Sequence, residues 1–123
     1  MPEITPENLD LLKKLQPLFK RVLGEWKIGH YCYSLLSKRL IYVDERELFF
    51  LNDVKEKEYT DKILRIPTLE ELWEMVDWSK WSDFGISPNG LYIWFMTALD
   101  EEPSIMADPY SALLQALCRQ EGV

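Results

Sequence analysis

The first stretch of the chain has the apolar period of an amphipathic helix. Thr5 is followed by proline and glutamate, which together supply an N-cap hydroxyl, a proline at the first helical position and an acid in the first turn. Apolar residues recur every three or four positions up to Leu23, and Gly24 is typical of a helix end. Because a proline inside a helix loses a hydrogen bond and clashes with the preceding turn, Pro17 predicts a kink or two short helices that meet near Gln16.

From residue 25 to residue 51 the pattern changes to aromatic and β-branched residues. Three runs, at about 25–33, 39–44 and 46–51, have the composition of strands, and the short polar link between the last two predicts a hairpin. Residues 52–62 are rich in charge and have no period, so they predict a mobile surface connection.

The next segment contains the clearest helix start in the chain. Thr68 and Glu71 match a capping box, in which hydroxyl and carboxylate each accept a hydrogen bond from a backbone N–H at the helix start. The residues that follow predict one apolar face, which includes Leu69, Leu72, Trp73 and Val76. We therefore expect Trp73 to point at the core.

The last third of the chain predicts a strand and a helix. Residues 78–90 lose helical periodicity and end in a Pro-Asn-Gly turn, so they predict a loop. Residues 90–99 are almost all apolar, which is typical of a central strand covered on both faces. After a polar loop over 100–107, Asp108 and the proline behind it predict a last helix that ends near Gly122.

Composition and charge narrow the class of protein. The chain has 123 residues, of which 47% are hydrophobic and 28% charged, so it can bury a core and should fold as one domain over residues 1–123. Twenty-one acidic residues against fourteen Lys and Arg give a net charge of -7, which repels nucleic acid. No signal peptide or apolar run of membrane-spanning length is visible, so we expect a cytoplasmic protein without membrane contact.

The residue types that carry catalysis or metals are sparse. Cys32 and Cys118 lie far apart without metal-ligand spacing, and both are typical of free buried thiols. His30 is the only histidine, and it lies two residues from Cys32 on the same strand face, where the two side chains seldom aim at each other. We therefore predict no catalytic residue, no metal and no cofactor.

The acidic residues at the end of the apolar run are a further candidate for a metal or catalytic site. Asp100, Glu101 and Glu102 could supply a metal site or an acid/base pair, but the same composition is typical of a solvated turn. The chain has no glycine-rich phosphate loop, nucleophile elbow or calcium loop. These observations argue against an enzyme.

Three of the five tryptophans fall between Trp73 and Trp81, and they raise the question of a binding surface. Trp78 and Trp81 follow the predicted helix, close to Phe84. Exposed together, these rings would form an apolar patch of the kind that binds a partner. Folded back, they would seal a sheet edge, with each indole N–H on a carbonyl. Trp78, Trp81 and Phe84 are the candidate interaction surface.

Parts of the chain resemble small proteins encoded by phages and prophages. Those proteins pair a W/I-x-P-x-x-x-x-L-x-x-M helix start with an aromatic strand and an A-L-L-x-A-L helix, and the matching residues here are Ile66, Pro67, Leu72, Met75, Trp94, Ala112, Leu113, Leu114, Ala116 and Leu117. Residues 26–30 are similar to their W-x-x-G-D segment, with His30 where an acid is usual. The resemblance implies a phage or bacterial origin and transfers no catalytic residue.

Taken together, the patterns predict a single α+β domain with a mostly antiparallel sheet of about four strands, at 25–33, 39–44, 46–51 and 90–99, packed with three helices. The expected function is a non-enzymatic phage or prophage accessory protein that binds a host or phage protein. Two alternatives stay open: an acidic mimic of nucleic acid that blocks a DNA-binding host protein, and a small hydrolase that uses His30 and the strand-end acids. A homodimer is also left open, because surplus apolar surface could be covered by a second copy.

Overall fold

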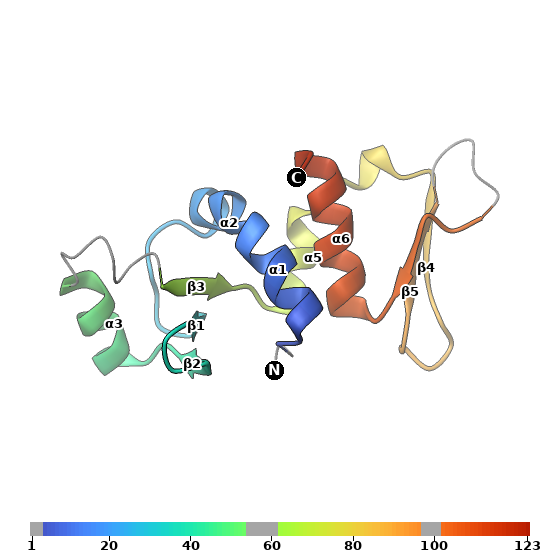
Figure 1. Cartoon of the computed structure of the whole chain (residues 1–123). Helices are drawn as coiled ribbons and strands as arrows, with labels where there is room; N and C mark the ends of the chain where they lie inside the picture. The colour runs from blue at the N-terminus through green and yellow to red at the C-terminus, as the bar shows by residue number, and fades with distance from the viewer. Residues whose placement is uncertain (1–3, 54–61, 97–101) are drawn as a thin grey trace.

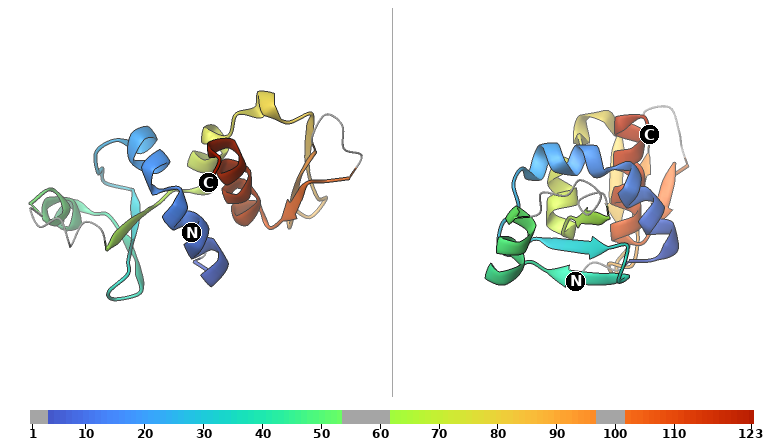
Figure 2. Two further views of the ribbon diagram at one scale, coloured as in Figure 1. Left: turned by 45° about the horizontal axis from the view of Figure 1, so that its top comes forward. Right: turned by 60° about the vertical axis from the view of Figure 1, so that its left-hand side comes forward.

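The chain folds into two small sheets with helices between them. The computed structural model describes residues 4–53, 62–96 and 102–123. Within these residues it has five α-helices and two three-stranded antiparallel sheets, sheet A and sheet B, with α1, α5 and α6 lying between the sheets (Figure 1; Figure 2, left). The α+β class is confirmed. The prediction of one sheet of about four strands with three helices is corrected, because the strands divide between two separate sheets.

The predicted break in the first helix is confirmed. Helix α1 spans Pro6–Lys14 and helix α2 spans Gln16–Leu23, with Leu15 as the junction. The Thr5 hydroxyl accepts a hydrogen bond from the Asn8 amide at 3.1 Å, as expected of an N-cap. Gly24 ends α2 with φ +67°, a backbone conformation that glycine adopts without strain.

Sheet A contains β1 (Tyr31–Ser34), β2 (Arg39–Tyr42) and β3 (Ile63–Ile66), in the order β2-β1-β3. Leu64 and Ile66 are buried in the core. Arg65, between them, therefore points to the opposite face of the sheet. The predicted strand at 25–33 is shorter than expected, because residues 27–30 form a turn with Gly29 at φ +98°. Strand β3 was not predicted.

The strand predicted at 46–51 is wrong, and so is its hairpin. The segment belongs to helix α3, Glu45–Asp53, whose start is capped by Asp44 Oδ1 accepting from the Glu47 amide at 2.9 Å. A short run of contiguous apolar residues fits a strand or a helix equally well, so the pattern alone could not decide. Residues 54–61 of the predicted surface connection lie outside the described residues.

The capping box at the next helix is confirmed. In α5, Leu69–Met75, the Glu71 amide donates to Thr68 Oγ1 at 3.2 Å and the Thr68 amide donates to Glu71 Oε1 at 2.9 Å. Leu72 is fully buried, but Leu69 is 44% exposed, so only part of the predicted apolar face reaches the core. A 3-10 turn, η1, follows at Trp78–Lys80.

Sheet B contains β4 (Asp83–Ile86), β5 (Ile93–Met96) and β6 (Ile105–Ala107), in the order β4-β5-β6. Two segments that were predicted as loops contain strands instead, β4 and β6. Both are three or four residues long and lie among polar residues, and they become strands through hydrogen bonding to β5. The turn between β4 and β5 was predicted, and Gly90 occupies it at φ +71°.

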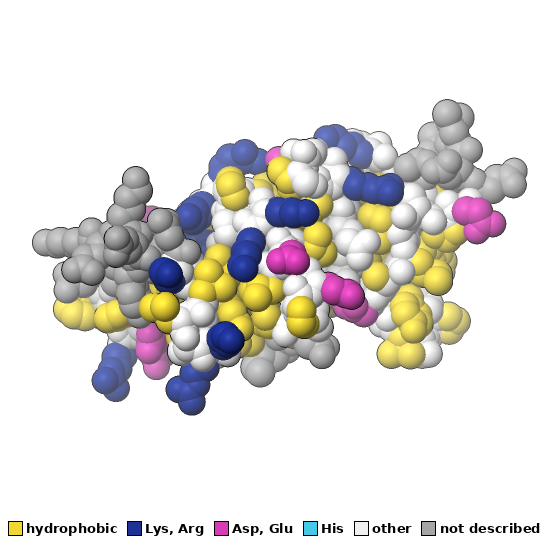
Figure 3. Space-filling model, in the orientation of Figure 1, with side chains coloured by type: hydrophobic (Ala, Val, Ile, Leu, Met, Phe, Trp, Pro, Cys, Tyr) yellow, Lys and Arg dark blue, Asp and Glu magenta, His cyan; other side chains and the backbone are white. Residues whose placement is uncertain are grey.

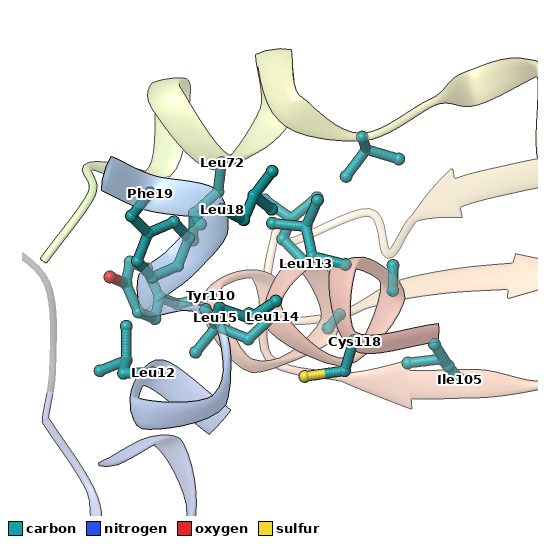
Figure 4. Close-up of a cluster of buried hydrophobic side chains, with 14 of the residues drawn as sticks. Leu12, Leu15, Leu18, Phe19, Leu72, Ile105, Tyr110, Leu113, Leu114 and Cys118 are labelled. Carbon is teal, nitrogen blue, oxygen red and sulfur yellow. The ribbon is translucent and has the colours of Figure 1, made fainter. Parts of the chain in front are cut away.

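The predicted last helix is confirmed as α6, Pro109–Glu121, with the Asp108 side chain as N-cap and Gly122 in the left-handed conformation behind it. Helix α6 is the centre of the core, since it packs against α1, α5 and sheet B (Figure 4). The Tyr110 hydroxyl ties it to the segment before α5 by donating to the Pro67 carbonyl at 2.7 Å. None of the helices in the described ranges has the length and apolar character that crossing a bilayer demands.

Candidate functional site

The three residues predicted as an interaction surface meet in one group of rings. The ring centroid of Trp78 lies 4.4 Å from that of Trp73 and 4.4 Å from that of Phe84. Phe95 completes the group, at 5.8 Å from Trp78 and 4.9 Å from Trp81. We call these five residues the aromatic cluster.

Hydrogen bonds fix the segment that carries the two loop tryptophans. Asp77 Oδ1 accepts from the amide and the hydroxyl of Ser79, at 3.2 and 2.6 Å, and the hydroxyl bond is the main cause that lowers the pKa of Asp77. Gln120 of α6 accepts from the Asp77 amide at 2.6 Å and donates to the Met75 carbonyl at 3.1 Å. The end of α6 therefore determines where η1 lies.

Most of the ring surface in the aromatic cluster faces the protein itself. Trp78 and Trp81 are half-buried against the core, and Trp78 Nε1 donates to the Trp73 carbonyl at 3.2 Å. Phe84 is the most exposed member, at 41%. This placement favours the sealing interpretation for the two tryptophans, while binding of a partner by the cluster stays a prediction.

Two hollows of opposite charge flank the aromatic cluster. One of about 300 Å³ is lined by Leu69, Glu70, Trp73 and Glu74. The other, of about 210 Å³, is lined by Lys80, Trp81, Arg119 and Gln120. The volume of the first hollow is at the low end of the range of pockets that enclose small-molecule ligands, and the volume of the second is below that range.

A second apolar surface lies on sheet B, on the face turned away from α6. Ile93, Phe95 and Ile105 point inward to the core. By strand alternation and register, Asp83, Gly85, Trp94, Met96 and Met106 share the opposite side, which we call the outer face. Met106 is 68% exposed. Figure 1 shows no helix of the described part of the chain on this side of β5, and Figure 3 shows hydrophobic side chains gathered over the β4–β5 hairpin.

The Trp94 indole lies against Gly85 on the outer face. A Cβ atom at position 85 would overlap the Trp94 ring, so only glycine permits this arrangement. The prediction that the apolar run at 90–99 is covered on both faces is therefore corrected for β5, whose outer face carries half-buried Trp94 and Met96. The alternation was visible in the sequence, but the sequence could not show which of the two faces a helix would cover.

A group of side chains around Arg65, which the sequence did not predict, lies beside sheet A. The Arg65 guanidinium stacks on the Trp26 ring at 4.1 Å, and the His30 ring lies 6.3 Å from the same ring. His30 Nδ1 accepts a hydrogen bond from the Lys27 amide at 3.2 Å. Burial is the main cause that lowers the pKa of His30, and Arg65 and Lys27 lower it further, whereas Glu71 raises it.

The two cysteines are free and buried, as predicted. Burial raises the pKa of the Cys32 thiol to about 11, and it also raises the pKa of the Cys118 thiol. Both are therefore protonated, unreactive thiols near neutral pH. Within the described ranges no three His, Cys, Asp or Glu side chains gather in a way that could hold a metal ion. Of the strand-end acids, Asp100 and Glu101 lie outside the described residues and Glu102 is exposed.

Comparison of the chain with protein-family models, with curated proteins and with solved structures finds no match. Arguments about function therefore rest on the geometry of these surfaces.

Proposed function

We propose that the chain is a non-enzymatic protein-interaction module and that the outer face of sheet B is its contact surface. The observation that carries the proposal is the outer face of sheet B, where exposed Met106 lies with half-buried Trp94 and Met96. Asp83 lies at the edge of this face, and helix α6 packs against the opposite side of the sheet. A sheet of a soluble protein commonly buries one face and presents a polar face to water. An exposed apolar face is instead typical of an interaction site.

The residue types of the outer face suit a protein partner. Tryptophan is enriched among the residues that dominate binding energy at interfaces, and methionine adapts its shape to the surface that it meets. Trp94 is held in place by its contact with Gly85, so little side-chain freedom is lost when a partner covers it. The aromatic cluster then has the separate role of joining η1 and β4 to the core.

The resemblance to phage and prophage proteins bears on the class of partner. If the chain has that origin, a host or virion protein is the expected partner. The proposal needs no cofactor, no nucleic acid and no catalytic residue.

The experiment compares two charge-introducing variants of exposed apolar residues. Met106→Glu places a charge on the outer face, and Leu36→Glu, 62% exposed in the β1–β2 turn of sheet A, is the matched control. Tagged wild-type and variant proteins are used to capture partners from host lysate, with quantitative mass spectrometry as the readout. We expect Met106→Glu to lose the captured protein by about tenfold or more, and Leu36→Glu to retain it.

Two outcomes would contradict this assignment. Equal capture by all three proteins, at unchanged thermal stability, would remove the outer face as the contact surface. Self-association of the wild-type chain in light scattering, lost in Met106→Glu alone, would replace the foreign partner with a second copy. A further pair, Trp78→Ala and Trp81→Ala, tests the aromatic cluster, and we expect it to lower stability more than capture.

A further inference from the structure

The strongest unexplained feature outside the outer face is the side chain of Arg65. It is 7% exposed, and its Nη1 is buried without a hydrogen-bond partner. Within the described ranges no carboxylate forms an ion pair with it, and burial lowers the pKa of its guanidinium. A buried charge is normally paired, because the protein interior solvates it poorly.

The contacts that Arg65 does make leave its donors free. The strand backbone of Arg65 is fixed by Gln16, whose amide donates to the Arg65 carbonyl at 3.0 Å and accepts from the Arg65 amide at 2.8 Å. The guanidinium plane stacks on Trp26, which offers a face of negative potential but no hydrogen-bond acceptor. Stacking uses the face of the guanidinium, so it gives the N–H groups on the edge no hydrogen-bond partner.

Further donors surround the same tryptophan. Because His30 Nδ1 accepts from the Lys27 amide, the proton of the neutral ring is on Nε2, which is then a donor. Lys27 is exposed on the same turn. Glu71 is the acid near His30, and its Oε1 is already taken by the Thr68 amide in the capping box.

We propose that Arg65, Trp26 and His30 form a binding site for a small oxyanion, a phosphate or a carboxylate group. The guanidinium edge matches the oxygens of either group, and His30 Nε2–H supplies a second direction of donation. The side of the site nearest to solvent is the turn of residues 27–30, since Lys27 and Ile28 are exposed there and Trp26 is half-buried. The site is on sheet A, at the opposite end of the molecule from the outer face, so it is independent of the proposed function (Figure 1).

The test titrates the full chain with inorganic phosphate and, separately, with acetate, at an ionic strength held constant with sodium chloride. Bound anion stabilises the folded state, so we expect the Tm to rise with the logarithm of the anion concentration. The Arg65 side-chain N–H and the His30 ring signals in NMR spectra should shift over the same range. A response to phosphate alone assigns a phosphate site, and a response to acetate assigns a carboxylate site.

Variants distinguish an anion-binding role of Arg65 from a purely structural role. Arg65→Lys keeps the charge but loses the planar edge, and we expect its affinity for the anion to fall by about tenfold or more. Arg39→Lys, an exposed arginine on β2 of the same sheet, is the matched control and should bind like wild type. Arg65→Met removes the unpaired charge, so without anion it should be as stable as wild type or more stable, and it should gain nothing from anion. If Arg65→Met does not fold, His30→Gln replaces it, with a severalfold loss of affinity expected.

The proposal is overturned if neither anion raises the Tm or moves the Arg65 and His30 signals of the folded wild-type chain. Equal responses of Arg65→Lys and Arg39→Lys would also overturn it, because the anion would then be bound elsewhere.

Discussion

Gln16 is a single residue that completes the edge of a sheet. It is 8% exposed, and its side-chain amide forms two hydrogen bonds with the backbone of Arg65, in the manner of a neighbouring strand. It also donates to the Leu12 carbonyl at 3.0 Å. Strand β3 is thereby closed on the side that faces α2, and an unpaired strand edge is avoided there.

We predict that Gln16→Leu destabilises the fold, although it keeps the volume of the side chain. The amide and carbonyl of Arg65 would lose their partners in a buried position, at a cost of about 1–3 kcal/mol for each group. Denaturant unfolding measures the loss, and hydrogen exchange should show the Arg65 amide losing protection. The control is Gln115→Leu, half-buried on α6, for which a change within about 0.5 kcal/mol is expected.

Gly85 provides a second prediction at this scale. Gly85→Ala should push the Trp94 indole off the sheet, because the new Cβ overlaps the ring. We expect the free energy of unfolding to fall by about 1–3 kcal/mol. In a double-mutant cycle the loss should vanish in the Trp94→Ala background, where no ring opposes the new methyl group. A loss of the same size in both backgrounds would contradict the contact.

His30 predicts a pH dependence of stability. Its pKa in the folded chain is below the ordinary value of 6.5, chiefly because of burial, so the unfolded chain binds the proton more tightly. The stability that this difference in pKa contributes is therefore fully present above pH 6.5 and is lost as the pH falls through the pKa of His30 in the folded chain. His30→Asn keeps an acceptor for the Lys27 amide without titrating, so its stability should fall less between about pH 7.5 and about pH 5. Identical pH profiles of the two proteins would contradict this role.

At the scale of elements, helices α1, α2, α5 and α6 follow local signals, whereas strands β3, β4 and β6 do not. The capping box of α5 combines two hydrogen bonds at the helix start, and it fixes the direction in which β3 leads into that helix. Strands β3, β4 and β6 have no comparable signal, since each consists of three or four residues whose partners lie elsewhere in the chain.

We predict that Thr68→Ala lowers the free energy of unfolding by about 0.5–2 kcal/mol, the range measured for loss of an N-cap hydroxyl. Thr68→Ser keeps the hydroxyl and should lose much less. Thermal or denaturant unfolding of both variants provides the measurement. Equal losses would show that the methyl group of Thr68, and not its hydrogen bond to Glu71, carries the stability.

At the scale of the whole molecule, one core joins the two sheets. Buried side chains from α1, α2, α5, α6 and both sheets belong to one cluster, and α6 lies in the middle of it (Figure 4). Leu113, Leu114 and Leu117 are each 0% exposed on that helix. A shared core makes the two sheets depend on the same contacts, which is the physical condition for cooperative unfolding.

We therefore predict that the chain unfolds in a single transition, as expected of one domain. Leu114→Ala should lower the free energy of unfolding by about 2–5 kcal/mol, because it leaves a cavity in the core. Hydrogen exchange at Cys32 in sheet A and at Phe95 in sheet B should show the same reduction. A loss of protection confined to one sheet would contradict a single cooperative unit.

The sequence by itself determined the α+β class, the two N-terminal helices, α5 and α6. Helices α1, α5 and α6 begin at a side-chain N-cap, and α2 begins at the break that Pro17 predicts. Each of these signals lies within a dozen positions of the helix, so it is local. The sequence also singled out Trp78, Trp81 and Phe84 as neighbours, which the aromatic cluster brings together.

Only the tertiary structure decided the sheets and the surfaces. The apolar run at 46–51 became a helix and two polar loops became strands, because pairing and burial depend on segments far away in the chain. Which side of β5 is covered depends on where α6 packs, and that position left Met106 exposed and Trp94 half-buried while it buried Phe95. The stacking of Arg65 on Trp26 likewise joins residues 39 positions apart. Contacts of this range are set by the packing of the whole chain and leave no periodic trace in the sequence.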